Sequence, residues 1–416
     1  MALIINQIDY LIRKMKVPEK YYFIIELGKA LHIYGIPSYK IQSYLTEVAK
    51  TQGITGSFMD SPTWINYVFY EDENSYNYIE CIPPGSLNLG AFSRIAELTN
   101  KVIDLKIDND SISNELTIIH SKTKIVNHLH LTLAYAFSAG CFSIMIGTNW
   151  ISFIFSLLLG AFIYLLVYLS TKSKYLENVF ESLSALLVTI ICCALSLIFP
   201  NFNLGLTILA SIIIFIPGLA ITTALEEITS KSLVSGGAKL FDSILLLFKQ
   251  FFGVILGISL MTSIVDIDLT YHVSEMPKWT IFLAIPIFSI TLLPIFQVRK
   301  KNMLFGAITG ITAFFITVLL SGYGVLISTF IGTLAVVGIS RLFGLISKTP
   351  KTVYLIQGII MLVPGSKSFM GLSNSFFNPS TTTGSVNLFE QVTFILMGII
   401  GGLLFAGTFR ERSPKK

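Results

Sequence analysis

The residues with the clearest chemical potential follow a proline inside an apolar stretch. Pro217 and Gly218 interrupt a long hydrophobic run. Hydroxyl and carboxyl side chains come directly after them, namely Thr222, Thr223, Glu226 and Glu227. Proline has no N–H and clashes with the carbonyl four residues back, so the carbonyl of Ile213 should lose its partner. In lipid such a group must be satisfied by protein or by a water-filled cavity. The pattern predicts a broken membrane helix beside a polar cavity that binds a substrate or an ion.

A second break of the same kind comes later in the chain. It consists of Pro364, Gly365, Ser366 and Lys367. Each break is followed by a polar stretch and then by Leu-Phe-acid, which is Leu240-Phe241-Asp242 in one case and Leu388-Phe389-Glu390 in the other. The proline-to-phenylalanine spacings are 24 and 25 residues. This shared order predicts a repeat whose two breaks flank one central site.

Four charged residues are further candidates for this site. Asp242 and Glu390 stand at matching positions, where each could bind a proton, a sodium ion or a substrate amine. Both could instead be first-turn carboxylates favoured by the helix dipole. Lys249 lies deeper and could neutralise a substrate carboxylate, unless it extends to the membrane surface or pairs with Asp242. Lys367 could hold a substrate carboxylate or be a solvated loop residue.

The composition places most of the chain in a membrane. Of 416 residues, 53% are hydrophobic and 13% charged, whereas soluble domains are about 25% charged. Residues 1–127 resemble a soluble sequence with mixed helix and strand patterns, while the remainder is nearly continuous apolar segments. The predicted fold class is a polytopic α-helical membrane protein with a small N-terminal cytoplasmic α+β domain. The net charge of +5 is accounted for by membrane loops and does not indicate nucleic-acid binding.

Ten apolar spans of about 20 residues can be drawn after residue 128. Pro217 falls in the fourth and Pro364 in the ninth, so five spans form each half. Because five is odd, the second half must be inverted, as in many secondary transporters. We therefore expect a cytoplasmic domain over 1–127, one repeat over 128–278 and a second over 279–416. Loop lysines and arginines gather on the side of both termini, with Lys278 and Lys367 on the other side, which predicts a multi-pass inner-membrane protein with cytoplasmic termini.

An enzyme is the main competing class. His32, Ser57, Asp60 and Ser61 could suggest a membrane-tethered hydrolase, but their spacing matches no nucleophile elbow or metal signature. The four cysteines indicate neither a disulfide framework nor a metal site. We expect no catalytic residue, no metal and no cofactor.

Several segments carry a family resemblance. In the N-terminal part they are Ala30–Pro37, Gly56–Thr63 and Pro84–Gly90, and in the membrane part Pro217–Thr222 and Leu362–Ser366. The chain resembles the threonine/serine exporter family, in the form that has both halves fused. The family's first motif usually continues with an asparagine and a basic–acidic pair, where this chain has Thr223, Glu226 and Glu227. Its second motif often has a basic residue where this chain has Met370.

The resemblance implies proton-driven export of threonine and serine across the cytoplasmic membrane. Related two-subunit members imply a dicarboxylate such as succinate as the alternative substrate. Pro217, Gly218, Thr222, Thr223 and Ser366 would then contact the substrate, with Lys249 or Lys367 at its carboxylate. Asp242, Glu390, Glu226 and Glu227 would be the candidates for proton or sodium coupling. The exact substrate, the coupling ion and the oligomeric state stay open.

Overall fold

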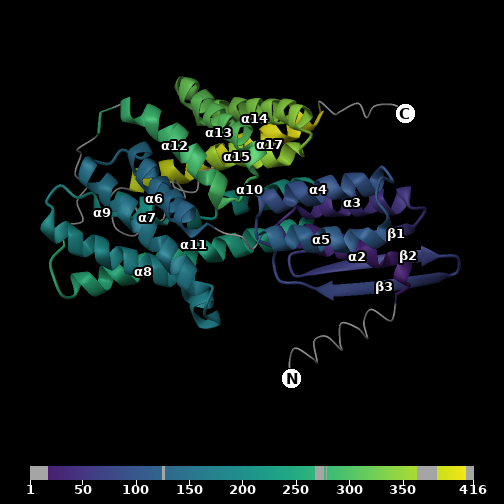
Figure 1. Ribbon diagram of the computed structural model, residues 1–416. Helices are drawn as coiled ribbons and strands as arrows, with labels where there is room; N and C mark the ends of the chain where they lie inside the picture. Colours follow the sequence, from purple (N-terminus) through teal and green to yellow (C-terminus); the bar gives the residue numbers. More distant parts are fainter. Residues whose placement is uncertain (1–16, 124–126, 268–275, 278, 363–381, 409–416) are drawn as a thin grey trace.

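The computed structural model describes residues 17–123, 127–267, 276–277, 279–362 and 382–408. Figure 1 shows an elongated molecule, with a sheet and its covering helices at one end and the long apolar helices at the other. The described residues up to 123 are called the N-terminal unit below.

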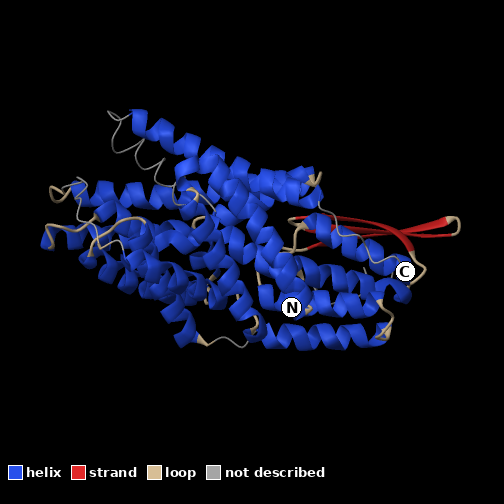
Figure 2. Ribbon diagram, turned by 90° about the horizontal axis from the view of Figure 1, so that it is seen from above, coloured by secondary structure: helices blue, strands red, loops and turns tan. Residues whose placement is uncertain are grey.

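The N-terminal unit is a layer of helices against one small sheet. Its elements are η1 (Glu19–Tyr21), α2 (Tyr22–Ile33), α3 (Ser38–Thr51), β1 (Thr55–Ser61), β2 (Trp64–Glu71), β3 (Asn74–Cys81), α4 (Leu89–Ile103) and α5 (Asn109–Thr123). The strands are antiparallel in the order β1-β2-β3, and Figure 2 shows them along one side of the helices. Ile65, Tyr67 and Phe69 alternate along β2 and are fully buried, as expected for a strand with one face on a core. The helix and strand patterns expected in this part of the chain are confirmed.

The described residues after 127 form helices joined by short connections. The helices are α6 (His128–Met145), α7 (Trp150–Ser170), α8 (Lys174–Ile198), α9 (Leu204–Ile212), η2 (Ile213–Phe215), α10 (Gly218–Thr229), α11 (Leu233–Thr262), α12 (Trp279–Ile295), α13 (Lys300–Leu319), η3 (Ser321–Tyr323), α14 (Val325–Ser347), α15 (Lys351–Leu362) and α17 (Thr382–Thr408).

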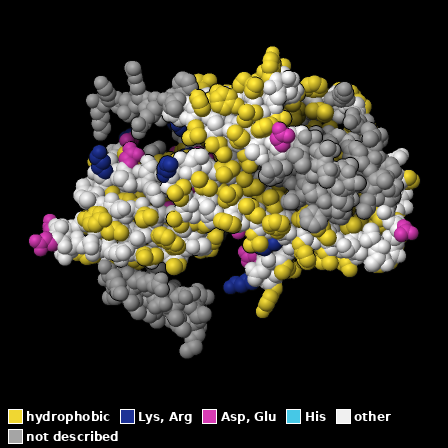
Figure 3. Space-filling model, turned by 180° about the vertical axis from the view of Figure 1, so that it is seen from behind, with side chains coloured by type: hydrophobic (Ala, Val, Ile, Leu, Met, Phe, Trp, Pro, Cys, Tyr) yellow, Lys and Arg dark blue, Asp and Glu magenta, His cyan; other side chains and the backbone are white. Residues whose placement is uncertain are grey.

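Within the described residues, six helices are long and apolar enough to cross a membrane, and a bent pair makes a seventh candidate. α12 and α15 are apolar but shorter. Large apolar side chains such as Phe248, Phe252 and Phe282 are more than half exposed, and Figure 3 shows hydrophobic side chains spread over this part of the surface. A surface of this kind is suited to lipid. The chain is a polytopic membrane protein, whereas ten spans, the inverted repeat and the proposed domain boundaries stay predictions.

Glycines allow the closest helix contacts. A Cβ on Gly253 of α11 would lie 2.3 Å from the carbonyl oxygen of Ser182 on α8, and one on Gly160 of α7 would lie 2.5 Å from that of Tyr135 on α6. Small residues let membrane helices approach at backbone distance. α8 and α11 are therefore fixed against each other beside the region of the first break.

The core of the N-terminal unit extends into the ends of some of the apolar helices. Leu293, Val353 and Tyr354 are buried in the same hydrophobic cluster as the residues of α2–α4. The Leu89 N–H donates to the Phe296 carbonyl at 3.0 Å, and the Asn88 side chain donates to that of Gln297 at 2.6 Å. The unit is thus packed onto the ends of α12, α13 and α15.

Candidate functional site

The first proline break has the expected bend. α9 and η2 end at Phe215, α10 begins at Gly218, and the two directions differ by 50°. Pro217 is the N-cap residue of α10, a position where its missing N–H costs nothing. The sequence therefore breaks the helix where predicted.

The expectation of a free carbonyl at Ile213 was wrong. Its oxygen accepts from the Ile216 N–H at 3.2 Å, because the chain tightens into a 3₁₀ turn before the proline. The carbonyl whose hydrogen bond comes from another helix is that of Phe215, which accepts from Gln250 Nε2 of α11 at 2.6 Å. Gln250 is buried, with 1% exposed. The protein, and not a substrate, satisfies the broken backbone here.

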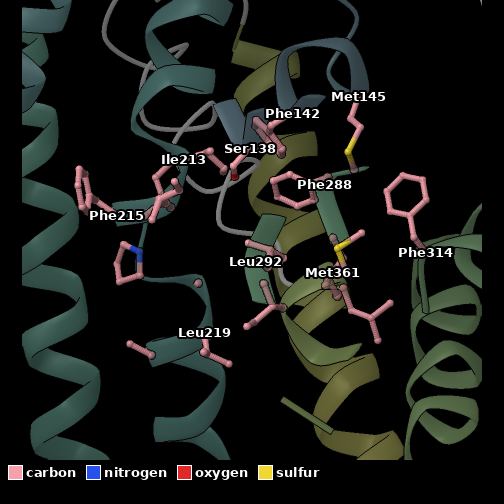
Figure 4. Close-up of a pocket in the computed structure, with 18 of the residues that line it drawn as sticks. Ser138, Phe142, Met145, Ile213, Phe215, Leu219, Phe288, Leu292, Phe314 and Met361 are labelled. Atoms are coloured by element: carbon pink, nitrogen blue, oxygen red, sulfur yellow. The ribbon is translucent and has the colours of Figure 1, made fainter. Parts of the chain in front are cut away.

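The break forms one wall of a cavity of about 980 Å³. Figure 4 shows Ile213, Phe215 and Leu219 on that wall, with Ser138, Phe142, Phe288, Leu292 and Met361 opposite or beside them. Residues 213–220, including Pro217 and Gly218, line the cavity together with parts of α6, α8, α12, α13, α14 and α15. Helices from both predicted halves thus enclose it, and the size is suited to a small molecule.

The cavity is mainly apolar. Of its described lining residues, Glu181 of α8 is the one with an ionisable side chain. Ser138 on α6 is fully buried, and its hydroxyl has no hydrogen-bond partner within the described residues. These two polar groups were not among the sequence predictions. The polar cavity expected from the sequence is therefore largely hydrophobic.

Thr222 and Thr223 do not line this cavity as described. The Thr222 hydroxyl donates to the Gly218 carbonyl at 3.1 Å, and that of Thr223 to the Ala220 carbonyl at 3.0 Å. Both hydroxyls are therefore used within α10, as is common for these residues in helices. Their predicted role at the substrate remains untested.

Glu226 and Glu227 are held by the N-terminal unit. Tyr39 donates its hydroxyl to Glu226 Oε1 at 2.6 Å. Glu227 is fully buried, and its Oε1 accepts from the Ser38 backbone N–H at 2.9 Å and from Lys239 Nζ. Burial and the negative charge of Glu226 raise the pKa of the Tyr39 hydroxyl well above its ordinary value of 10.0, so this hydroxyl stays a donor. Consecutive carboxylates on α10 thus meet consecutive residues at the start of α3.

A buried polar chain continues from this contact into the N-terminal unit. The Ser38 hydroxyl lies 2.6 Å from that of Ser235 and donates to Asp60 Oδ2 at 2.5 Å. Asp60 Oδ1 lies 2.7 Å from His32 Nδ1, and His32 Nε2 faces the Pro83 carbonyl at 3.3 Å. His32 and Asp60 do come together, as the hydrolase alternative required.

The arrangement nevertheless differs from that of a serine hydrolase. In such a triad histidine lies between the acid and the serine, whereas here Asp60 lies between His32 and Ser38. Ser57 is exposed on β1, and Ser61 is buried. The observed bonds tie elements together and leave the second histidine nitrogen on a backbone carbonyl.

The remaining candidates are dispersed. Lys249 Nζ is 3.7 Å from Glu181 Oε2, so the suggested pairing with Asp242 was wrong. Asp242 and Glu390 are exposed, and neither is in the first turn of its helix, because α11 begins at Leu233 and α17 at Thr382. The second break, Pro364, Gly365, Ser366 and Lys367, lies outside the described residues. No group of three or more potential metal ligands occurs in the described part of the chain.

A bent apolar helix, a cavity enclosed by several apolar helices and a lipid-facing surface define a polytopic membrane protein with an internal binding space. Two family models match the chain, one described as a putative threonine/serine exporter over residues 22–261 and one as a threonine/serine exporter over 281–409. The chain belongs to the threonine/serine exporter family.

Curated proteins match this chain at low sequence identity. The pheromone-regulated membrane protein 10 of Kluyveromyces lactis is 26% identical over 411 residues, which cover 93% of this chain and 43% of that protein. Its namesake in Eremothecium gossypii is 25% identical over 293 residues, or 68% of this chain and 39% of that protein. An uncharacterized protein of Schizosaccharomyces pombe is 22% identical over 368 residues, or 84% and 44%. The chain spans less than half of the length of these relatives. No solved structure is significantly similar to it.

Proposed function

We propose that the protein is a secondary active exporter of threonine and serine, with the cavity beside Pro217 as its central binding site. The observation that carries this proposal is the cavity itself, whose wall includes a helix broken at Pro217 and Gly218. Broken helices at internal sites are a recurrent feature of secondary transporters. Membership of the exporter family supports the same function.

In this proposal the ten-span inverted repeat supplies alternating access. One half rocks against the other and exposes the cavity to each side of the cytoplasmic membrane in turn. Pro217 and Gly218 contact the substrate, and Ser366 and Lys367 of the second break are proposed as further substrate contacts. The proton motive force drives the cycle.

The N-terminal unit lies on the cytoplasmic side and holds α10 in position. Its contacts to Glu226 and Glu227 support this role. Those carboxylates are accordingly weaker candidates for proton coupling than the exposed Asp242 and Glu390. The unit is then part of the transporter and not a tethered enzyme.

Efflux from preloaded cells tests the function. Cells with and without the protein are loaded with labelled threonine, serine or succinate, and each release rate is measured before and after the proton gradient is collapsed. We expect faster threonine and serine release that depends on the gradient. Faster release of succinate alone would make the protein a dicarboxylate exporter, and no difference for any of the three would refute the proposal.

A further inference from the structure

The cavity carries polar groups at few points, and these restrict what it can bind. Glu181 lies two turns into α8 and lines the same cavity as Phe215 and Pro217. Its side chain is 24% exposed. A carboxylate in an apolar wall needs a cation or hydrogen-bond donors.

The pairing of Glu181 with Lys249 leaves the carboxylate only partly satisfied. Lys249 Nζ approaches Oε2 at 3.7 Å, which is an ion-pair distance but too long for a hydrogen bond. Oε2 is buried and accepts no hydrogen bond from the described residues. Oε2 is therefore left without a hydrogen-bond donor, while the exposed 24% of the side chain is the part that an incoming N–H group can reach first.

A second unused polar group faces the same space. The Ser138 hydroxyl is fully buried, without a partner among the described residues, and belongs to the cavity lining. Figure 4 shows it among apolar side chains that include Phe142 and Phe288. An unpaired buried hydroxyl is costly, so it is suited to a ligand's carboxylate.

Most of the rest of the wall is aliphatic and aromatic, and the lining hydroxyls of Thr317, Ser328 and Thr329 already donate to carbonyls of their own helices. Leu219, Leu292, Phe314 and Met361 line it. Such a surface cannot strongly reject an isostere that differs by one hydroxyl group, and discrimination is typically about 100-fold at most. Valine is the apolar isostere of threonine.

We propose that Glu181 binds the ammonium group of an amino acid in this cavity, and that the apolar wall admits valine as well as threonine. This inference rests on the proposed function and narrows its substrate class. Amino acids with small hydroxylated or branched apolar side chains are accepted. A dicarboxylate such as succinate, which has no ammonium group and would meet the charge of Glu181, is excluded.

The test uses the full chain, purified and reconstituted in liposomes. Initial rates of labelled threonine and valine transport are measured for the wild type, Glu181→Gln and Glu181→Asp. Glu177→Gln is the matched control, because Glu177 is exposed in the first turn of the same helix and does not line the cavity. We expect Glu181→Gln to lose at least about tenfold in both rates, Glu181→Asp to keep part of the activity and the control to match the wild type.

A purely structural ion pair is distinguished by Glu181→Gln combined with Lys249→Met. If the pair only maintains the fold, removal of both charges should restore transport; if Glu181 binds the ammonium group, transport stays low. Four results would each overturn the inference while threonine export by the wild type stands. They are normal transport by Glu181→Gln, recovery in the double variant, competition by succinate equal to that of threonine, and no valine transport. A wild type that transports no amino acid would remove the proposed function and the inference together.

Discussion

The backbone N–H of Ser38 donates to Glu227 Oε1 at 2.9 Å, across 189 residues of sequence. Ser38 begins α3, and Glu227 lies on the helix that follows the proline break. Through this bond the N-terminal unit holds the half-helix that forms part of the cavity wall. The position of the break is thus linked to a part of the chain that looks independent in the sequence.

Replacing Glu227 with alanine should destabilise the protein. It leaves the buried Ser38 N–H unpaired and removes the partner of Lys239, at a cost of about 1–3 kcal/mol. Thermal unfolding of the detergent-solubilised protein measures the effect. Glu47→Ala, on the exposed face of α3, is the control and should change the unfolding temperature little. An unchanged unfolding temperature for Glu227→Ala would show that the contact contributes nothing.

Gln250→Leu should weaken the broken helix. The substitution removes the donor to the Phe215 carbonyl and leaves that carbonyl unsatisfied inside the protein, again at about 1–3 kcal/mol. We expect a lower unfolding temperature and slower threonine efflux at equal amounts of protein in the membrane. Thr262→Val, an exposed polar-to-apolar change on the same helix, should leave both unaltered. Equal behaviour of the two variants would argue against a role of Gln250 at the break.

Gly253→Ala should force α8 and α11 apart. The added Cβ would lie 2.3 Å from the Ser182 carbonyl oxygen, and overpacking of this kind costs about 1–3 kcal/mol. Gly237→Ala is the matched control, because a Cβ there meets nothing within 4 Å on the same helix. A comparison of their unfolding temperatures tests the packing directly; a Gly253→Ala variant as stable as the control would contradict it.

The contact between Glu97 and the start of α13 should depend on pH. Burial alone would raise the pKa of Glu97, but hydrogen bonds from Arg299 and Lys301 outweigh burial and hold the pKa below its ordinary value of 4.5. A carboxylate whose pKa is lower in the folded state contributes stability that is fully present above the unfolded-state pKa. This stability is lost as the pH falls through the folded-state pKa. Unfolding temperatures of the wild type and Glu97→Gln should therefore differ at neutral pH and converge as the pH falls through the lowered pKa of Glu97. A constant difference across this range would refute the assignment.

Local patterns in the sequence predicted the local structure well. The mixed helix and strand patterns expected before residue 128 agree with the described N-terminal unit, and Pro217 marked the bend between α9 and α10. Each of these depends on neighbours within a few residues, where periodicity and proline chemistry act directly.

The predicted site was less accurate because its contacts are distant in sequence. Glu181 was missed because α8 begins at Lys174, ahead of its apolar stretch, and so carries Glu181 to the cavity. Gln250 reaches the break from 35 residues away, and nothing in the spacing reveals that it replaces the expected substrate contact. Asp242 is not the first-turn carboxylate that the sequence allowed, because α11 begins at Leu233, ahead of its apolar stretch.

Threonine transport by the purified protein tests the central claim most directly. Liposomes that contain only this protein are loaded with labelled threonine, and efflux is followed while a proton gradient is imposed and then collapsed with a protonophore. The account predicts release above that of empty liposomes, faster with the gradient and slowed when it is collapsed. Release equal to that of protein-free liposomes under both conditions would contradict it.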